Sequence, residues 1–208
     1  MITIIDYGMG NLRSIQNMLK HIDVPSEITS EVSKIENAEN IILPGVGAFD
    51  TAMANIDNMD IRDILRDKAL VEKTPMLGIC LGMQLLGKGS QEGKAEGLGL
   101  LDAVSKKFDF RKADKKHSVP HMGWNTVNPR HHDSLFQDMA GESRFYFVHS
   151  YHVVCENEDD ILATTDYGIE FTSAVQRDNI YGVQYHPEKS HRFGMQLLKN
   201  FAEMYRYA

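Results

Sequence analysis

A cysteine between two glycines is the first feature of the sequence that could perform covalent chemistry. Gly78, Cys80 and Gly82 follow an apolar run and lead into a helical segment. This small–x–nucleophile–x–small pattern is typical of a nucleophile elbow, a sharp strand-to-helix turn with no room for bulky neighbours. The turn would place Cys80 at a helix N-terminus, which favours a thiolate. A buried structural cysteine in a glycine-rich turn is the alternative.

A histidine and a glutamate two residues apart could supply the base that such a nucleophile needs. His186, Pro187 and Glu188 follow a strand-like stretch, residues 180–185. On an extended chain, residues two apart point the same way, and the proline stiffens the arrangement. A carboxylate on one ring nitrogen would leave the other nitrogen free to face a thiol. Alone, this turn is more often a solvated loop. With the cysteine elbow upstream, it predicts a triad of Cys80, His186 and Glu188.

These two motifs and four others resemble the class I glutamine amidotransferases, which use a Cys-His-Glu triad. Within that family the resemblance is strongest to the glutaminase subunits of imidazole glycerol phosphate synthases, and it covers nearly the whole chain in the family's order. The motifs are Asp6-Tyr-Gly-Met-Gly-Asn-Leu12, Leu43-Pro-Gly-Val-Gly47, Gly78-Ile-Cys-Leu-Gly-Met-Gln84, His121-Met-Gly-Trp-Asn125, Phe147-Val-His-Ser-Tyr-His152 and Gly182-Val-Gln-Tyr-His-Pro-Glu-Lys-Ser190.

The resemblance implies functions for further residues near the triad. The backbone N–H groups of Gly47 and Leu81 would form an oxyanion hole, and Leu81 follows the nucleophile as elbow geometry requires. Free glutamine carries an amino group and a carboxylate, so its recognition needs an acid and several neutral donors and acceptors. The residues that would bind it are Gln84, Glu92, Ser150 and Tyr151. For Glu92, a position in a solvated loop is an equal alternative on the sequence alone.

The resemblance also implies a protein partner and no metal or other cofactor. Ammonia released from L-glutamine would pass to a (β/α)8-barrel cyclase subunit in a heterodimer. That subunit makes imidazole glycerol phosphate and an aminoimidazole carboxamide ribotide in histidine biosynthesis. The residues expected at the contact are Asn11, Trp124, Tyr146 and Lys189. From the residues alone, Trp124 would pack in the core and Asn11 could cap the helix that follows it.

One stretch departs from the family pattern. After His-Pro-Glu-Lys-Ser the family is usually rich in glycine and alanine, whereas this chain has His191-Arg-Phe-Gly-Met195. The segment Lys88-Gly-Ser-Gln91 is also unusual for the histidine pathway. Similar variants occur among paralogues that supply ammonia for amidine formation on surface-polysaccharide sugars. The expected glutaminase chemistry is the same in both cases, and the ammonia acceptor differs.

Two hypotheses from other classes remain open at this stage. A Cys-His peptidase-like protein would need a substrate groove and would give no special function to Gln84, Ser150 and Tyr151. A non-catalytic regulatory protein would have no use for an intact triad. Hydrolysis of glutamine but of no peptide would exclude the first, and covalent labelling of Cys80 by a glutamine-like electrophile would exclude the second.

The composition predicts a cytoplasmic protein with a single domain over residues 1–208. Its 42% hydrophobic and 25% charged residues are ordinary for a globular chain. The net charge of −7, with no basic cluster, argues against nucleic-acid binding. Two distant cysteines make no disulfide framework, and we expect neither a signal peptide nor a membrane-spanning segment.

Apolar periodicity predicts an α/β fold, a three-layer arrangement with a mostly parallel open sheet and helices on both faces, and the resemblance implies the flavodoxin-like fold of class I glutaminases. Expected strands are residues 1–5, 27–29, 40–43, 76–79 and 180–185; expected helices are residues 12–22, 48–55 and 60–69 and the C-terminal segment after residue 190. Shorter strands between residues 100 and 176 would extend the sheet. We interpret His149 and His152 as structural, and we expect the site beyond the C-terminal strand ends.

Overall fold

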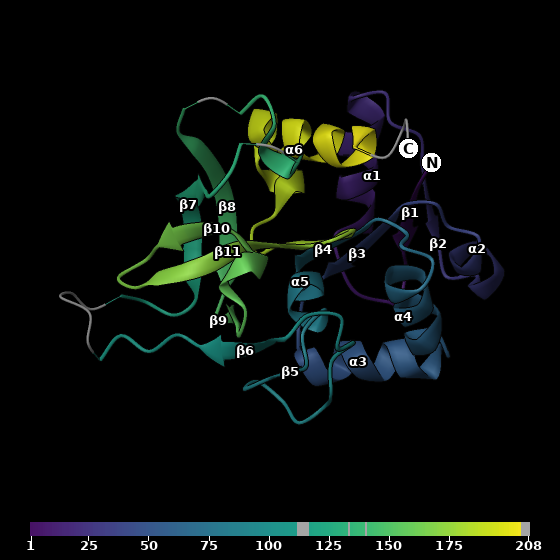
Figure 1. Ribbon diagram of the computed structural model, residues 1–208, viewed down its shortest axis with the longest axis horizontal. Coiled ribbons are helices and arrows are strands. Elements are labelled where there is room, and N and C mark those ends of the chain that lie inside the picture. Colours follow the sequence, from purple (N-terminus) through teal and green to yellow (C-terminus); the bar gives the residue numbers. More distant parts are fainter. Residues whose placement is uncertain (112–116, 133, 140, 205–208) are drawn as a thin grey trace.

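One mixed sheet runs through the computed structural model of the chain, which describes residues 1–111, 117–132, 134–139 and 141–204 (Figure 1). Its strand order is β2-β1-β3-β4-β12-β11-β10-β7-β8, and three further strands branch from this path. Within these described ranges, no helix has both the length and the apolar character that crossing a membrane requires.

Five parallel strands form the half of the sheet that carries the elbow. They are β1 (Ile2–Ile5), β2 (Ser26–Thr29), β3 (Ile41–Gly45), β4 (Met76–Cys80) and β12 (Ile180–Val183). All but β2 are buried along their whole length, as parallel strands covered on both faces should be. Strand β12 pairs directly with β4, so the segment around residue 186, which follows β12, lies next to the elbow. The two segments are about a hundred residues apart in sequence.

Helices cover both faces of these parallel strands. Figure 1 shows α1 and α6 on one side of the sheet and α3, α4 and α5 on the other. Their bounds are α1 Leu12–His21, α2 Val32–Glu36, α3 Phe49–Asn58, α4 Arg62–Leu70, α5 Leu81–Leu85 and α6 His191–Glu203. Two separate buried apolar clusters fill the two interfaces. The predicted three-layer α/β architecture is confirmed.

An antiparallel meander forms the other half of the sheet. Strand β11 (Glu170–Arg177) pairs antiparallel with β12, and β10, β7 and β8 continue the sheet from it. The remaining bounds are β5 Gly89–Ser90, β6 Ala103–Lys107, β7 His121–Pro129, β8 Ser143–His149, β9 Tyr151–Cys155 and β10 Ile161–Asp166, with 3₁₀ turns η1 Ser134–Phe136, η2 Glu158–Asp160 and η3 Pro187–Lys189. The predicted strands between residues 100 and 176 are therefore present.

Candidate active site

The backbone at Cys80 has the strained conformation of a nucleophile elbow. Cys80 ends β4 with φ 57° and ψ −110°, and α5 begins at the next residue. Residues other than glycine rarely adopt a positive φ, and such strain concentrates at functional sites. A side chain on Gly78 would approach the Gly82 carbonyl oxygen to 2.6 Å, and one on Gly82 would collide with the Leu43 carbonyl. Both glycines are therefore required by the close packing of this turn.

A short turn, rather than an extended segment, brings Glu188 to His186. The ring nitrogen His186 Nδ1 lies 2.8 Å from Glu188 Oε1. Pro187 begins the 3₁₀ turn η3, so the expectation of an extended His-Pro-Glu stretch is wrong. The turn is tied to the sheet because the His186 N–H donates to the Tyr146 carbonyl (2.9 Å) and the Ser190 hydroxyl donates to the His186 carbonyl (2.6 Å).

The three candidate groups interact electrostatically in a buried environment. Burial opposes the charged form of His186, but the interactions of its ring with Cys80 and Glu188 outweigh burial and raise the pKa of His186 to about 10. Burial would also raise the pKa of Glu188, but hydrogen bonds from His186 and Asn11 and the histidine charge lower it. His186 is therefore an imidazolium beside a carboxylate at neutral pH. Because Glu188 holds Nδ1, Nε2 is the ring nitrogen left to interact with Cys80 and with reacting atoms.

A cavity of about 320 Å³ lies over the elbow, at the C-terminal ends of β3 and β4. Its volume is within the range of small-molecule sites, and its position is where open α/β sheets bind ligands. The predicted site residues that line it are Gly47, Cys80, Leu81, Gln84, Glu92, Ser150, Tyr151 and His186. The structure thus brings the candidate nucleophile, base, oxyanion-hole and substrate-binding residues to one cavity.

Glu92 lies at the cavity but also holds a helix end. Its Oε2 atom accepts a hydrogen bond from the Phe49 N–H at the start of α3 (2.9 Å). Reciprocally, the Asp50 carboxylate in the first turn of α3 accepts from the N–H groups of Lys94 and Ala95, and these bonds lower the pKa of Asp50. The loop that carries Glu92 is therefore fixed to α3, instead of being a freely solvated loop.

Asn11 does not cap the helix that follows it. It precedes α1, but its side chain makes no capping hydrogen bond, so the expected capping is wrong. Instead, Asn11 Nδ2 donates to Glu188 Oε1 at a distance of 3.0 Å. The same carboxylate oxygen accepts from Asn11 and lies next to His186, so Asn11 fixes the carboxylate that orients the histidine.

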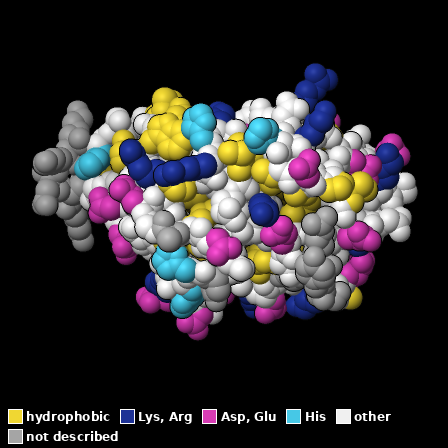
Figure 2. All heavy atoms as spheres, turned by 90° about the horizontal axis from the view of Figure 1, so that it is seen from above, with side chains coloured by type: hydrophobic (Ala, Val, Ile, Leu, Met, Phe, Trp, Pro, Cys, Tyr) yellow, Lys and Arg dark blue, Asp and Glu magenta, His cyan; other side chains and the backbone are white. Residues whose placement is uncertain are grey.

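Trp124 does not pack in the core. Its side chain is 41% exposed, and its ring contacts the Tyr146 ring edge-to-face with centroids 6.2 Å apart. Lys189 Nζ lies 5.7 Å from the centroid of the Tyr146 ring, and the His191 ring stacks on Trp124 at 5.5 Å. Three of the residues expected at a subunit contact therefore form one surface cluster. Figure 2 shows hydrophobic, histidine and basic side chains together on the face seen from above.

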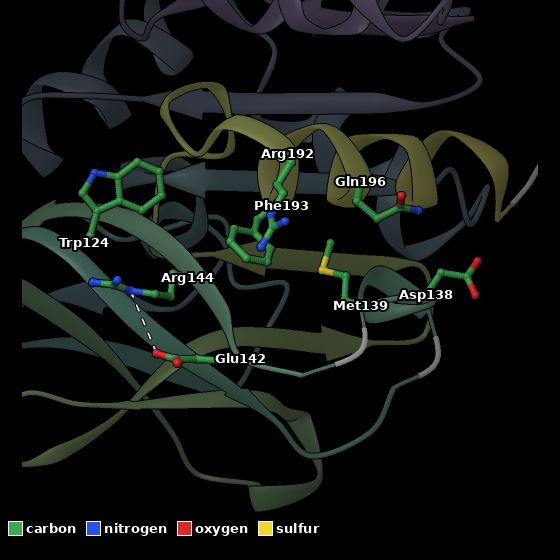
Figure 3. A pocket seen from close by; sticks show the side chains of 8 residues that line it. All are labelled: Trp124, Asp138, Met139, Glu142, Arg144, Arg192, Phe193 and Gln196. Carbon is green, nitrogen blue, oxygen red and sulfur yellow. Dashed lines mark ion pairs between the residues drawn. The ribbon is translucent and has the colours of Figure 1, made fainter.

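A second cavity lies away from the triad and has no cysteine, serine or threonine in its lining. It measures about 780 Å³, and its lining is Trp124, Asp138, Met139, Glu142, Arg144, Arg192, Phe193 and Gln196 (Figure 3). Arg144 and Glu142 form a long ion pair across it (4.0 Å). None of the triad residues contributes to this lining. We therefore assign the chemistry to the smaller cavity over Cys80.

The sequence interpretation missed part of the cavity wall. His149, expected to be structural only, lines the cavity together with Val46, Pro120 and Val148. Its Nδ1 atom lies 2.8 Å from the Tyr151 carbonyl oxygen, and its Nε2 atom lies 3.0 Å from His121 Nδ1. The pairing of β7 with β8, which places His121 opposite His149, could not be read from the sequence.

Comparisons with known proteins agree with this geometry. The family model of class I glutamine amidotransferases matches residues 3–204. The chain is 53% identical over 201 residues to imidazole glycerol phosphate synthase subunit HisH 2 of Methanococcus maripaludis, covering 97% of this chain and 98% of that protein. It is 48% identical over 204 residues to subunit HisH 2 of Pseudomonas aeruginosa (98% and 100% covered) and 44% identical to subunit HisH of Leptospira borgpetersenii (98% and 100%).

Solved structures of lower sequence similarity share the fold. The structure of PurLQS from Thermotoga maritima matches with a TM-score of 0.73 at 17% identity, over 96% of each chain. A crystal structure of a glutamine amidotransferase matches with a TM-score of 0.72 at 19% identity, over 97% of each chain. The chain therefore belongs to the class I glutamine amidotransferase family, and within it to the HisH subunits of imidazole glycerol phosphate synthase.

Proposed function

We propose that the protein hydrolyses L-glutamine to glutamate and ammonia, and that the ammonia is used by a (β/α)8-barrel cyclase subunit of an imidazole glycerol phosphate synthase. The observation that carries the proposal is that Cys80 and His186 line one cavity, while Glu188 holds Nδ1 of His186, whose ring interacts with both Cys80 and Glu188. Membership in the HisH family supports histidine biosynthesis as the pathway.

The first half of the reaction forms a thioester. The Cys80 sulfur attacks the side-chain amide carbon of glutamine, and the carbonyl oxygen becomes an oxyanion held by the N–H groups of Gly47 and Leu81. Each such donor stabilises a transition state by roughly 3–4 kcal/mol in a comparable enzyme. His186, protonated at neutral pH, donates its proton to the leaving nitrogen. The C–N bond then breaks, and ammonia leaves.

The second half of the reaction returns the enzyme to its starting state. His186 is now neutral and accepts a proton from water, which attacks the thioester carbon. The C–S bond breaks, glutamate is released, and the sulfur again carries its negative charge. Glu188 keeps the proton on Nδ1 of His186, so that Nε2 is the nitrogen that exchanges protons in both halves.

Substrate binding uses groups that the structure has already ordered. Gln84 donates to the Tyr151 carbonyl (3.2 Å), so its amide is fixed at the cavity wall. Glu92 and Ser150 line the same cavity. We assign the amino and carboxylate groups of glutamine to these residues, because together they offer one acid and several neutral donors and acceptors.

A docked partner is chemically useful because free ammonia is protonated in water and then loses its nucleophilicity. The surface cluster of Trp124, Tyr146 and Lys189 is our candidate contact, since it combines an exposed aromatic ring with a cation. Asn11 joins this contact to the site through Glu188, the residue before Lys189.

Cys80→Ala tests the proposal in the complex with the cyclase subunit. We expect glutamine-dependent synthesis of imidazole glycerol phosphate to fall by at least about 10⁴-fold, because no other group can form the thioester. Synthesis from ammonium salts should persist, since the cyclase then receives ammonia directly. Cys155→Ala is the matched control and should retain both activities, because Cys155 lies on β9 outside the cavity lining. Glutamine-dependent synthesis by the Cys80 variant would remove Cys80 from the mechanism.

A second candidate for the acceptor is amidine formation on a surface-polysaccharide sugar. It is favoured by the segment His191–Met195, which departs from the pattern usual in the histidine pathway. His191 stacks on Trp124, so the unusual segment forms part of the candidate partner contact. Glutamine hydrolysis without imidazole glycerol phosphate synthesis, when the chain is paired with the histidine-pathway cyclase of the same organism, would support this candidate.

A further inference from the structure

A buried glutamine contacts the candidate nucleophile from a second side. Gln184 follows β12 and lies two residues before His186. Its side chain is fully buried, and its backbone N–H donates to the Ser173 carbonyl (2.9 Å), which continues the pairing with β11. Its side-chain Nε2 atom lies 3.8 Å from Cys80 Sγ, within hydrogen-bond range for sulfur.

The glutamine also joins the nucleophile to the substrate-binding wall. Gln184 Oε1 accepts a hydrogen bond from Gln84 Nε2 at 3.1 Å. The same Gln84 nitrogen donates to the Tyr151 carbonyl oxygen at 3.2 Å. A continuous chain of hydrogen bonds therefore runs from the Tyr151 backbone through two buried amides to the Cys80 sulfur.

The direction of this chain is set by its backbone end. A carbonyl oxygen only accepts, so the Tyr151 carbonyl requires the nitrogen of Gln84 on its side. That nitrogen in turn requires the oxygen of Gln184. Only the amide nitrogen of Gln184 is then left to face Cys80, and the sulfur must be the acceptor. The orientation of both amides thus follows from the network.

We propose that Gln184 is a positioning residue that donates its amide N–H to the Cys80 sulfur, holds the sulfur toward the cavity and favours its ionised form. A hydrogen bond to an ionised acceptor is stronger than one to a neutral acceptor, so the contact stabilises the thiolate relative to the thiol. The N–H also adds a fixed donor in a buried environment, where donors act more strongly than in water. This inference deepens the proposed function and depends on Cys80 being the nucleophile, but its test does not use glutamine.

The test is the rate of alkylation of Cys80 by iodoacetamide, measured by peptide mass spectrometry on the full chain at pH 7 and pH 10. Gln184→Leu removes the donor and keeps the approximate size of the side chain. We expect alkylation of Cys80 to slow about tenfold at pH 7 and to stay within about twofold at pH 10, because alkaline pH favours a thiolate whether or not the donor is present. Gln184→Glu replaces the donor by a carboxylate and should slow the reaction at pH 7 further.

Gln176→Leu is the matched control, since Gln176 lies on β11 and its side chain bonds Ser134 instead of the elbow. It should leave both alkylation rates unchanged. Circular dichroism checks folding, and Gln184→Met replaces the leucine variant if that variant is unfolded. Unchanged alkylation at pH 7 in the Gln184 variants, or an equal loss at both pH values, would show that Gln184 only fills space and would overturn the proposal. Absence of glutaminase activity with the predicted alkylation pattern would overturn the proposed function alone.

Discussion

Two buried histidine environments border the same cavity, and their pKa values are shifted in opposite directions although burial lowers both. The pKa of His186 is raised to about 10, whereas burial lowers the pKa of His149 to about 3 and that of His121 to about 4. All three rings are almost inaccessible to solvent. Burial therefore does not decide the charge of a histidine here.

The partners of each ring explain the difference. His186 has the Glu188 carboxylate at 2.8 Å and Cys80 nearby, and these groups favour the imidazolium. The bonds of His149 and His121 go to neutral groups. His149 Nδ1 donates to the Tyr151 carbonyl, so its Nε2 accepts from His121 Nδ1, and His121 Nε2 accepts from the Asn125 amide (3.3 Å).

The contrast separates His186, which transfers protons in the proposed mechanism, from His149 in the cavity wall and its partner His121. A neutral His149 keeps a fixed hydrogen bond to the Tyr151 carbonyl, to which Gln84 also donates. In the proposed mechanism the two environments would act on different parts of the reaction: His186 on the bonds that break, and His149 on the position of the substrate-binding segment.

Removing the carboxylate should break the contrast and have the larger effect. Glu188→Gln keeps the size of the side chain but removes the negative charge beside His186. We expect kcat for glutamine hydrolysis in the complex to fall about 10³–10⁴-fold, since the analogous change in a serine protease triad costs about 10⁴-fold. Steady-state kinetics would measure it.

Glu203→Gln is the control for this variant, because Glu203 lies at the end of α6 and pairs only weakly with Lys199 (4.0 Å). Its kinetics should equal those of the unaltered protein. Full activity of the Glu188 variant would mean that the carboxylate neither orients nor charges His186.

The neutral pair of histidines should appear in the pH dependence of stability. The pKa values of His149 and His121 are lower in the folded protein than in the unfolded chain, so acid favours unfolding. Between about pH 6 and pH 5 the free energy of unfolding should fall by up to about 1.4 kcal/mol per pH unit for each of the two. His186 does not contribute in this window, because its raised pKa keeps it protonated when folded and it is protonated when unfolded as well.

Urea denaturation at several pH values measures this slope. His149→Gln keeps a hydrogen-bonding side chain but removes one titrating ring. It should reduce the dependence of the unfolding free energy on pH by up to about 1.4 kcal/mol per pH unit, the contribution of one proton. An unchanged slope would show that His149 is protonated when folded, which would contradict the proposed contrast.

The parallel core was predictable because its signals are local. Buried apolar runs such as Met76–Cys80 and the glycines around Cys80 need no partner to be recognised. Predicting the triad required only that its two motifs follow neighbouring strands. Strands β4 and β12 meet this condition. The prediction of an extended His-Pro-Glu stretch was wrong, because Pro187 starts a turn.

Contacts that depend on side-chain direction and on distant pairing were not predictable. The position of Asn11 before a helix is typical of a cap, but the fold places Glu188 beside it, and the Asn11 amide nitrogen donates to that carboxylate. Gln184 lies in an apolar strand pattern, and only the fold shows that its amide reaches Cys80. The sequence around His149 indicates a strand, and its place at the cavity depends on β8 and β9 meeting the elbow.

A histidine NMR titration of the ¹⁵N-labelled full chain tests the central claim most directly. We predict that the His186 ring shows imidazolium chemical shifts at pH 8, while the His149 ring stays neutral at pH 5. Cys80→Ala and Glu188→Gln assign the His186 signal, since each removes a group that acts on it. A neutral His186 at pH 8 would contradict the account, because the ring would then hold no proton for the leaving ammonia.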